Sequence, residues 1–496
     1  MTARPNMRSA PSLARRLGTA TLFSLLMATT LPISHAIAED LLIARGNEPV
    51  SIDPHFSRNG NNQMTSLHIF DRLLLSDENA RPTPGLAVSW ENEDELTWLV
   101  HLREGVQFHD GTPFTAHDVV YSFERAPDVP NSPASYAESL STLESMEVVD
   151  DYTIRFTSNR PNPQFMENIG NIYIISRGAA ADAESVDFND PAVAVGTGPF
   201  RFVSWVPGDR LILERNPDYW GEVSDFETVT MRFITNDAAR VAALLAGDVD
   251  VIDLVAPADL PQLRESSNIN VFETGTVRLI YLALNQADDA PLLTDLSGAA
   301  LDENPLQDPN VRRAISLMID RSGITENILQ GSGEPASQTV PEGVYGYTDA
   351  LPVTQPDIDE AQRLLAEAGY PDGFGVTVHG SGDRFLMDGE ITQAIGQMLA
   401  RGGLQVNGVE VRPYSVYTGE AANGQYSLFI FSYGNSSGEA SRGLSNLFNT
   451  FDPDRDLGTL NRFRYSNPEF DELIARALEE FDVDVREQLL GEAAVL

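Results

Sequence analysis

The stretch from Thr97 to Arg125 places a strand, a turn and a capped helix one directly after another, which constrains the fold more than any other segment. Residues Thr97–Arg103 alternate their side chains as a half-buried strand does. Residues His109–Pro113 have the chemistry of a turn, because Gly and Pro each fix backbone torsions. Thr115 then predicts an N-cap, and Asp118 completes a capping box. A strand followed so closely by a helix is typical of α/β architecture.

Further helices and strands alternate along the rest of the chain. Three helices are predicted to begin after residues whose side chains can cap them, namely Asn236, Asp308 and Asp357. Strands are predicted over Val249–Val255 and Arg278–Asn285. Because 496 residues exceed one ordinary domain, the sequence predicts an α/β protein of several domain-sized units.

The N-terminus has the pattern of an export signal. Its basic residues precede an apolar stretch from Leu17 to Ile33. Ala36-Ile37-Ala38 then fits a cleavage site, which would leave Glu39 as the mature N-terminus. We expect residues 1–38 to be a removed signal peptide. The alternative is an N-terminal membrane anchor, for which the apolar stretch is short.

Cysteine is absent, which excludes disulfides, thiolate metal sites and a lipid-modified N-terminal cysteine. An exported protein without a lipid anchor is therefore expected to be free in a periplasm.

The charge balance excludes another class of partner. There are 73 Asp and Glu residues against 33 basic residues, and every basic residue is Arg. A formal charge of −40 repels phosphate backbones, so the sequence predicts no nucleic-acid binding. A saline habitat and a codon usage that replaces Lys with Arg both fit this composition, but only the first explains so many acids.

No motif predicts an enzyme or a metal site. Gly196–Pro199 lacks the spacing of a dinucleotide-binding loop, and a phosphate-binding loop would need a lysine. His379–Asp383 brings Ser, His and Asp together without a nucleophile elbow, which indicates a Gly-rich loop. His101, His109 and His117 include no close pair of metal ligands. We expect no catalysis, no cofactor and no metal held directly by the protein.

Several segments together resemble one family, the family 5 extracellular solute-binding proteins. The opening block GLAVSWENEDELTWLVHLREGVQFHDGTPFTAHDVVYSFER begins at Gly85, and VGTGPFRFVSWVPGDRLILERNPDYWG begins at Val195. The segments DPNVRRAISLMIDR, DEAQRLLAEAGYPDGFG and YSNPEFDELI follow at Asp308, Asp359 and Tyr465. These segments extend over nearly all of the chain after residue 38.

The resemblance implies an α/β fold of the periplasmic binding protein type II-like flytrap kind, with two main lobes and an extra inserted domain. Lobe I would comprise residues 39–57 and 195–281, the inserted domain residues 58–194, and lobe II residues 282–496. Ligand would bind between lobes that close by a hinge motion. Members of the family continue beyond the point that corresponds to Leu496, where this chain ends inside a helix predicted from Pro468 onward. The resemblance therefore implies that a C-terminal return segment is missing.

The resemblance also points to binding residues in three segments. The loop Ser381–Gly389 precedes a helix predicted near Glu390, and in dipeptide-binding relatives an arginine near Arg384 clamps the peptide carboxylate. The second segment is Leu428–Leu447. Peptide-binding relatives often have a Trp and then an Asp in this segment, and this chain has other residues at those places. This segment offers Tyr433, Gly434, Asn435, Ser436 and Glu439. The third, Phe56–Gln63, offers Ser57 and Asn59.

The function implied is that of a periplasmic binding protein, most simply a monomer, which delivers peptides or similar small solutes to an ABC permease in the inner membrane. Because the expected Asp after Tyr433 is missing, opines, oligosaccharides and chelated nickel stay open as ligands. An exported hydrolase and a ligand sensor for a chemoreceptor are the alternatives from other classes.

Overall fold

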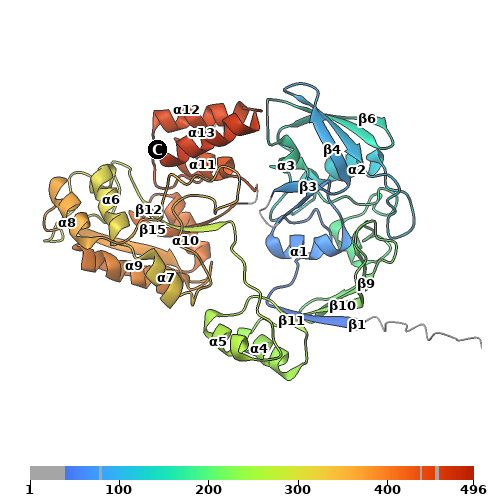
Figure 1. Ribbon diagram of the computed structural model, residues 1–496, viewed down its shortest axis with the longest axis horizontal. Helices are drawn as coiled ribbons and strands as arrows, with labels where there is room; N and C mark the ends of the chain where they lie inside the picture. The colour runs from blue at the N-terminus through green and yellow to red at the C-terminus, as the bar shows by residue number, and fades with distance from the viewer. Residues whose placement is uncertain (1–38, 78–80, 436–437, 453–456) are drawn as a thin grey trace, which may run out of the picture. The chain divides into compact units, whose positions relative to one another are not determined.

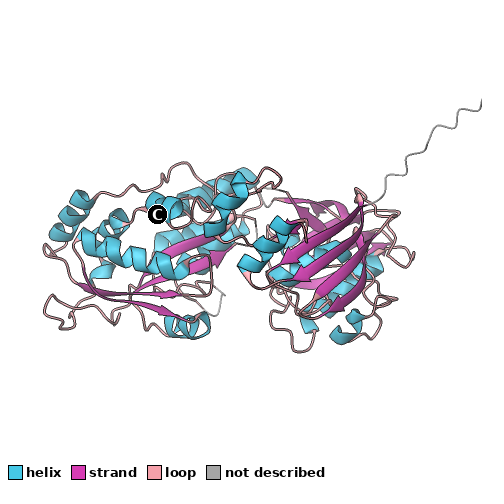
Figure 2. Ribbon diagram, turned by 90° about the horizontal axis from the view of Figure 1, so that it is seen from below, coloured by secondary structure: helices cyan, strands magenta, loops and turns pink. Residues whose placement is uncertain are grey.

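The computed structural model describes residues 39–77, 81–435, 438–452 and 457–496. The predicted signal peptide, residues 1–38, lies outside these ranges. Within them the strands form four sheets, and helices pack against the sheets (Figure 2). None of the described helices is both long and apolar enough to cross a bilayer.

The first sheet has the strand order β11-β1-β10-β9-β8. Its strands are β1 (Glu39–Arg45), β8 (Phe200–Val206), β9 (Arg210–Arg215), β10 (Phe226–Phe233) and β11 (Val251–Ile252). β1 is parallel to both of its neighbours, whereas β8, β9 and β10 are antiparallel. Helices α4 (Asp237–Ala246) and α5 (Leu260–Glu265) lie on either side of β11 in sequence, and Asn236 caps α4 as predicted.

The strand predicted over Val249–Val255 is wrong in length, since only Val251–Ile252 pair with β1. Carboxylates at both of its ends bind backbone donors of the β1 segment. Asp250 accepts a hydrogen bond from Leu42 N at 2.8 Å, and Asp253 accepts one from Gly46 N at 2.9 Å. Leu254 then has a φ of 52°, which ends the extended backbone.

The second sheet is antiparallel, with β4 (Ala87–Asn92), β5 (Thr97–Leu102), β7 (Thr153–Ser158) and β6 (Leu143–Asp150) in this order. β2 (Leu74–Ser76) and β3 (Pro82–Pro84) form a small separate sheet. Helices α1 (Gly60–Ile69), α2 (Ala116–Arg125) and α3 (Phe165–Ile169) accompany them. The prediction for Thr97–Arg125 is confirmed. Alternate residues of β5 are buried, and Thr115 N donates to Asp118 Oδ2 at 3.0 Å where α2 begins.

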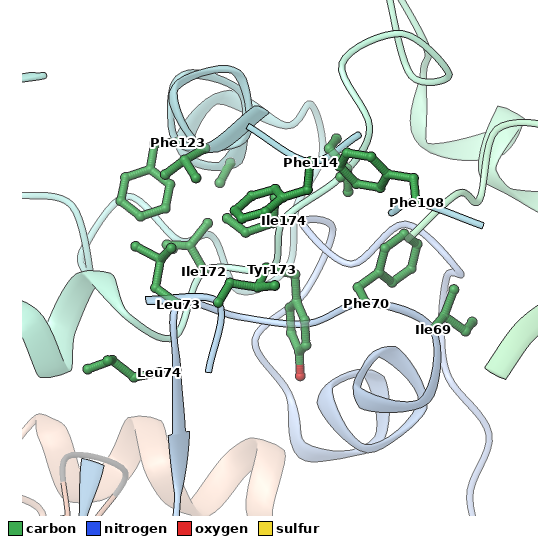
Figure 3. Close-up of a cluster of buried hydrophobic side chains, with 14 of the residues drawn as sticks. Ile69, Phe70, Leu73, Leu74, Phe108, Phe114, Phe123, Ile172, Tyr173 and Ile174 are labelled. Carbon is green, nitrogen blue, oxygen red and sulfur yellow. The ribbon is translucent and has the colours of Figure 1, made fainter. Parts of the chain in front are cut away.

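One continuous core joins the first and second sheets, and we call it the N-terminal core. Its fully buried side chains run from Ile52 to Met231 and come from β5, β9, β10 and α2 among other elements. Figure 3 shows the part around Phe108 and Phe114, whose rings meet edge to face with centroids 6.3 Å apart. The segments that the resemblance assigns to lobe I and to the inserted domain therefore share a core.

The third sheet has the order β12-β15-β13-β14. Its strands are β12 (Arg278–Leu284), β13 (Gly375–Ser381), β14 (Gln405–Arg412) and β15 (Leu428–Gly434). β13 is parallel to β14 and β15, whereas β12 runs antiparallel to β15. The proposed boundary between residues 281 and 282 falls inside β12, which pairs with β15 along its whole length.

The two faces of the third sheet are covered by different helices. Leu428 and Ile430 of β15 pack with α6 (Pro309–Met318), α8 (Ile358–Glu367) and α9 (Asp388–Gly402), and α7 (Arg321–Asn327) follows α6. The alternate residues Phe429, Phe431 and Tyr433 pack with α10 (Tyr414–Ala422). Successive side chains of a strand point to opposite faces of the sheet, so β15 is buried on both faces.

The predicted helix caps in this half of the chain are confirmed. Asp308 Oδ1 accepts a hydrogen bond from Asn310 N at 2.8 Å, and Asp357 Oδ1 accepts one from Glu360 N at 2.9 Å. Side-chain acceptors at these positions satisfy backbone donors that the first helical turn leaves free. α9 begins at Asp388, slightly before the predicted position.

Three C-terminal helices, α11 (Ala440–Phe448), α12 (Pro468–Glu479) and α13 (Val483–Val495), pack together around a core of their own (Figure 1). The single helix predicted from Pro468 to the end is wrong, because α12 ends at Glu479. Asp482 Oδ1 accepts hydrogen bonds from Asp484 N and Val485 N, both at 3.1 Å, and so starts a second helix.

Candidate ligand-binding site

Two of the three predicted binding segments, Ser381–Gly389 and Leu428–Leu447, meet at one edge of the third sheet. The parallel strands β13 and β15 both have their carboxyl ends there, at Ser381 and Gly434, and the antiparallel β12 begins there at Arg278. Ligands of open α/β sheets bind at the carboxyl ends of the strands, where loops rather than helices meet the edge. Arg384 follows β13 at this edge, and Asn435 follows β15.

A buried carboxylate fixes the loop that carries Arg384. Asp388, which is 3% exposed, accepts hydrogen bonds on Oδ2 from Ser381 Oγ at 2.8 Å and from Arg384 N at 2.9 Å. Met387, just before α9, has a φ of 56°. The backbone at Arg384 is therefore held relative to both the end of β13 and the start of α9.

The Arg384 side chain is exposed, and its guanidinium lies over the Tyr414 ring with Cζ 4.8 Å from the centroid. Tyr414 N in turn donates to Asp383 Oδ1 at 2.7 Å. Among the described residues no carboxylate lies within 4.0 Å of the Arg384 guanidinium. Stacking leaves the N–H groups in the guanidinium plane able to bind an anion.

A second arginine lies at the same edge of the sheet. Arg278 is the first residue of β12 and pairs with Gly434 across the sheet. Burial, and after it the charge of Arg384, lowers the pKa of Arg278. Its Nη1 lies 3.5 Å from Ser432 Oγ, and no ion pair with a described carboxylate forms. We call Arg278 and Arg384 the arginine pair.

The sequence analysis missed Arg278. Its place in the site depends on the antiparallel pairing of β12 with β15, which are about 150 residues apart in the chain. The predicted strand Arg278–Asn285 placed it at a strand start. No pattern within that segment says which strand lies beside it.

Internal contacts engage the predicted binding residues at the end of β15 and just after it. Tyr433 is 6% exposed, and burial raises the pKa of its phenol. Asn435 is 2% exposed and donates through Nδ2 to Glu439 O. Gly434 ends the strand, and Ser436 lies outside the described residues. A role of these residues in ligand binding stays a prediction.

Glu439 is buried between elements that are far apart in sequence. Its carboxylate forms an ion pair with Arg486 of α13 and accepts hydrogen bonds from Ser441 Oγ and Gln164 Nε2. Burial raises the pKa of Glu439. Because its oxygens already have these partners, the structure gives Glu439 a role in joining α11 and α13 to the segment before α3.

Ser57 and Asn59 also make local contacts. Ser57, which is 1% exposed, accepts a hydrogen bond on Oγ from Asn59 N at 3.3 Å, and Asn59 caps α1 by accepting from Asn62 N at 3.0 Å. Arg58 between them pairs with Glu138 at 2.7 Å. Glu138 also pairs with Arg442 of α11. Glu138 thus connects the predicted loop Phe56–Gln63 with the segment Leu428–Leu447.

Three of the residues considered for catalysis and metal binding, Ser381, His379 and His109, have other partners. Ser381 Oγ donates to Asp388, while the His379 ring stacks on Tyr426 with centroids 4.1 Å apart. His109 Nε2 lies 3.0 Å from Gly198 O, and burial lowers its pKa to about 4. In the described ranges no group of three His, Cys, Asp or Glu side chains could hold a metal ion.

Comparison with known proteins places these features in a family. A family model described as "Bacterial extracellular solute-binding proteins, family 5 Middle" matches residues 81–454. Heme-binding protein A of Haemophilus influenzae is 28% identical over 87% of this chain and 80% of that protein. The periplasmic oligopeptide-binding protein OppA of Salmonella typhimurium is 26% identical over 94% of this chain and 87% of that protein.

A solved structure shows the same fold. The periplasmic binding protein DppA of Helicobacter pylori, in complex with the peptide STSA, is 27% identical with a TM-score of 0.69. The match covers 92% of this chain and 90% of that chain. It confirms the predicted α/β fold of a type II-like periplasmic binding protein. The chain belongs to the bacterial extracellular solute-binding proteins of family 5.

Proposed function

We propose that this protein is the periplasmic substrate-binding component of an ABC importer that captures peptides or peptide-like solutes. The observation that carries the proposal is the Arg384 guanidinium, which the loop before α9 holds at the carboxyl edge of the third sheet without a described acidic partner. In a chain with 73 acidic residues, an arginine kept apart from carboxylates is available to an anionic ligand.

A peptide carboxylate suits this environment. A guanidinium binds a carboxylate through two parallel charge-assisted hydrogen bonds. Arg384 also lies just before the 15-residue helix α9, whose dipole attracts an anion to its N-terminal end. The relatives support the same ligand class, since one is named for oligopeptides and a related structure contains a peptide.

The remaining parts of the proposal follow from the family. Residues 39–57 with 195–281, residues 58–194 and residues 282–496 are lobe I, the inserted domain and lobe II, and the two lobes close around the ligand. Residues 1–38 direct export, and the protein acts in the periplasm as a monomer without a lipid anchor. It hands its ligand to an inner-membrane permease and performs no chemistry on it.

Other ligands with acidic groups would use the same guanidinium. The relative from Haemophilus influenzae is named for heme, whose propionates are carboxylates. Opines also bear carboxylates, whereas oligosaccharides and chelated nickel would rely on other groups. A ligand panel separates these classes.

The experiment is a thermal-shift screen followed by calorimetry. Its panel contains di- and tripeptides, glutathione, heme, opines, oligosaccharides and nickel–histidine. A ligand at a hundred times its dissociation constant adds about 2.7 kcal/mol to the free energy of unfolding. We expect peptides to raise the melting temperature, and Arg384→Ala to weaken their binding at least about tenfold, which corresponds to about 1.4 kcal/mol.

Arg401→Ala is the matched control, because Arg401 is an exposed arginine at the other end of α9. It should leave peptide affinity unchanged. Stabilisation by heme, opines, oligosaccharides or nickel–histidine alone would contradict the peptide proposal. Turnover of a peptide or ester in the same samples would contradict the assignment as a binding protein.

A further inference from the structure

The arginine pair is electrostatically unusual in this chain. Arg278 begins β12 opposite Gly434, and Arg384 follows β13 on the other side of β15, so both arginines lie at the same edge of the third sheet. The charge of Arg384 also contributes to the lowered pKa of Arg278. The 33 basic residues are outnumbered by 73 acidic residues, so a carboxylate counterion for each arginine would be easy to supply. Two guanidiniums at one sheet edge, neither with a described carboxylate partner, are therefore suited to bind an anion.

The acids nearest in sequence do not neutralise the pair. Asp388 uses Oδ2 for Ser381 Oγ and Arg384 N, and Oδ1 for its neighbour Gly389 N at 3.0 Å. Asp383 Oδ1 accepts from Tyr414 N. Both carboxylates therefore shape the loop through backbone contacts, and the guanidinium groups remain without a carboxylate partner among the described residues.

The two arginines are placed by different elements. The pairing of β12 with β15 fixes the backbone of Arg278. Its side chain lies near Gly434 of β15, since a methyl group added at Gly434 would be 3.9 Å from Arg278 Nη2. Arg384 is fixed by the Asp388 loop and by the Tyr414 ring. The backbone position of neither arginine depends on the other, so the strand pairing and the loop contacts independently bring two positive charges to the same sheet edge.

We infer that Arg278 is a second anion-binding residue, so that the arginine pair selects solutes with two anionic groups at the same end. A peptide whose C-terminal residue is Asp or Glu has this chemistry, because its side-chain carboxylate lies close to its terminal carboxylate. This inference rests on the proposed peptide-binding function and specifies the ligand more narrowly.

The test compares two peptides that differ in one charge and almost nothing else, Ala-Ala-Glu and Ala-Ala-Gln. Dissociation constants are measured by calorimetry for the wild type, Arg278→Gln, Arg384→Gln and the control Arg401→Gln. Measurements at about 0.15 M salt limit the repulsion from the acidic surface, because the screening length is then about 8 Å. Melting curves without ligand establish that each variant folds.

We expect the wild type to bind Ala-Ala-Glu at least about tenfold more tightly than Ala-Ala-Gln. Arg278→Gln should abolish this ratio and leave the affinity for Ala-Ala-Gln within about threefold of wild type. Arg384→Gln should weaken both peptides. Arg278→Lys keeps the charge without the forked geometry, and should retain part of the preference for Ala-Ala-Glu.

Two results would overturn the inference. In one, the wild type binds both peptides equally. In the other, Arg278→Gln weakens both to the same extent, which would make Arg278 a general support of the site. Absence of binding to either peptide by the folded wild type would instead overturn the proposed function, and the inference with it. The two failures are therefore distinguishable.

Discussion

Among single residues, Glu167 stands out because its carboxylate is enclosed beside another buried acid. Its Oε2 has no hydrogen-bond partner among the described residues, and it lies near Glu439 and Arg486. Burial, with a contribution from the charge of Glu439, raises the pKa of Glu167 to about 7. An ionised carboxylate without full compensation destabilises the folded state.

This pKa predicts a pH-dependent effect of Glu167→Gln. Between the ordinary Glu value of 4.5 and about 7, the folded protein holds a proton on Glu167 that the unfolded chain lacks. The Glu167 contribution to stability is therefore present at low pH and lost as pH rises through this window. We expect Glu167→Gln to gain stability relative to wild type between pH 5 and 8, by at most about 3 kcal/mol.

Urea unfolding at several pH values measures this difference. The comparison with wild type is needed because burial lowers the pKa of His55 and of His109 to about 4, and both groups act on stability in the opposite direction. Glu227→Gln, at an exposed position of β10, is the control and should follow the wild type at every pH. A constant difference between Glu167→Gln and wild type would show that Glu167 is already ionised at pH 5.

Among the elements, the turn between α12 and α13 connects the C-terminal helices with the N-terminal core. Phe481 in this turn packs against that core, with its ring centroid 6.4 Å from that of Trp98. Trp98 stacks in turn on Phe165 of α3, at 6.2 Å. The ion pair of Glu138 with Arg442 of α11 runs between the same two parts of the chain.

Phe481→Ala should therefore weaken the connection between these parts. We expect a loss of about 1–3 kcal/mol in the free energy of unfolding, as for removal of a partly buried aromatic ring. Unfolding should also become less cooperative, which circular dichroism and calorimetry detect as a broader or divided transition. Phe272→Ala removes a ring that is 92% exposed and should change neither quantity. Equal effects of both substitutions would contradict the role of Phe481.

Local patterns predicted much of the fold, but not the partners of the site. Asn236, Asp308 and Asp357 cap their helices as expected, because a cap is formed within a few residues. Arg384 was predicted from the family resemblance and not from a local pattern. Arg278 joins the site through a strand pairing, and Glu439 contacts Gln164 at a separation of 275 residues. No sequence periodicity specifies contacts across such distances.

Over the whole molecule, the excess of acids sets a property that no single contact determines. A formal charge of −40 is spread along the chain, and the positive charges are arginines alone. Repulsion within a surface of one sign destabilises the compact state. Several ion pairs, such as those of Arg155 with Glu93 and Glu147, oppose this effect but lie at exposed positions, where each contributes little.

Added salt should therefore stabilise this protein. Sodium chloride between about 0.05 and 0.5 M shortens the screening length and weakens both the repulsion and the exposed ion pairs. Because acids outnumber basic residues by more than two to one, we expect the loss of repulsion to dominate and the melting temperature to rise. Sucrose of equal osmolarity controls for solute exclusion, and sulfate is avoided because it strengthens apolar burial directly. A melting temperature that falls with sodium chloride would mean that the ion pairs outweigh the repulsion.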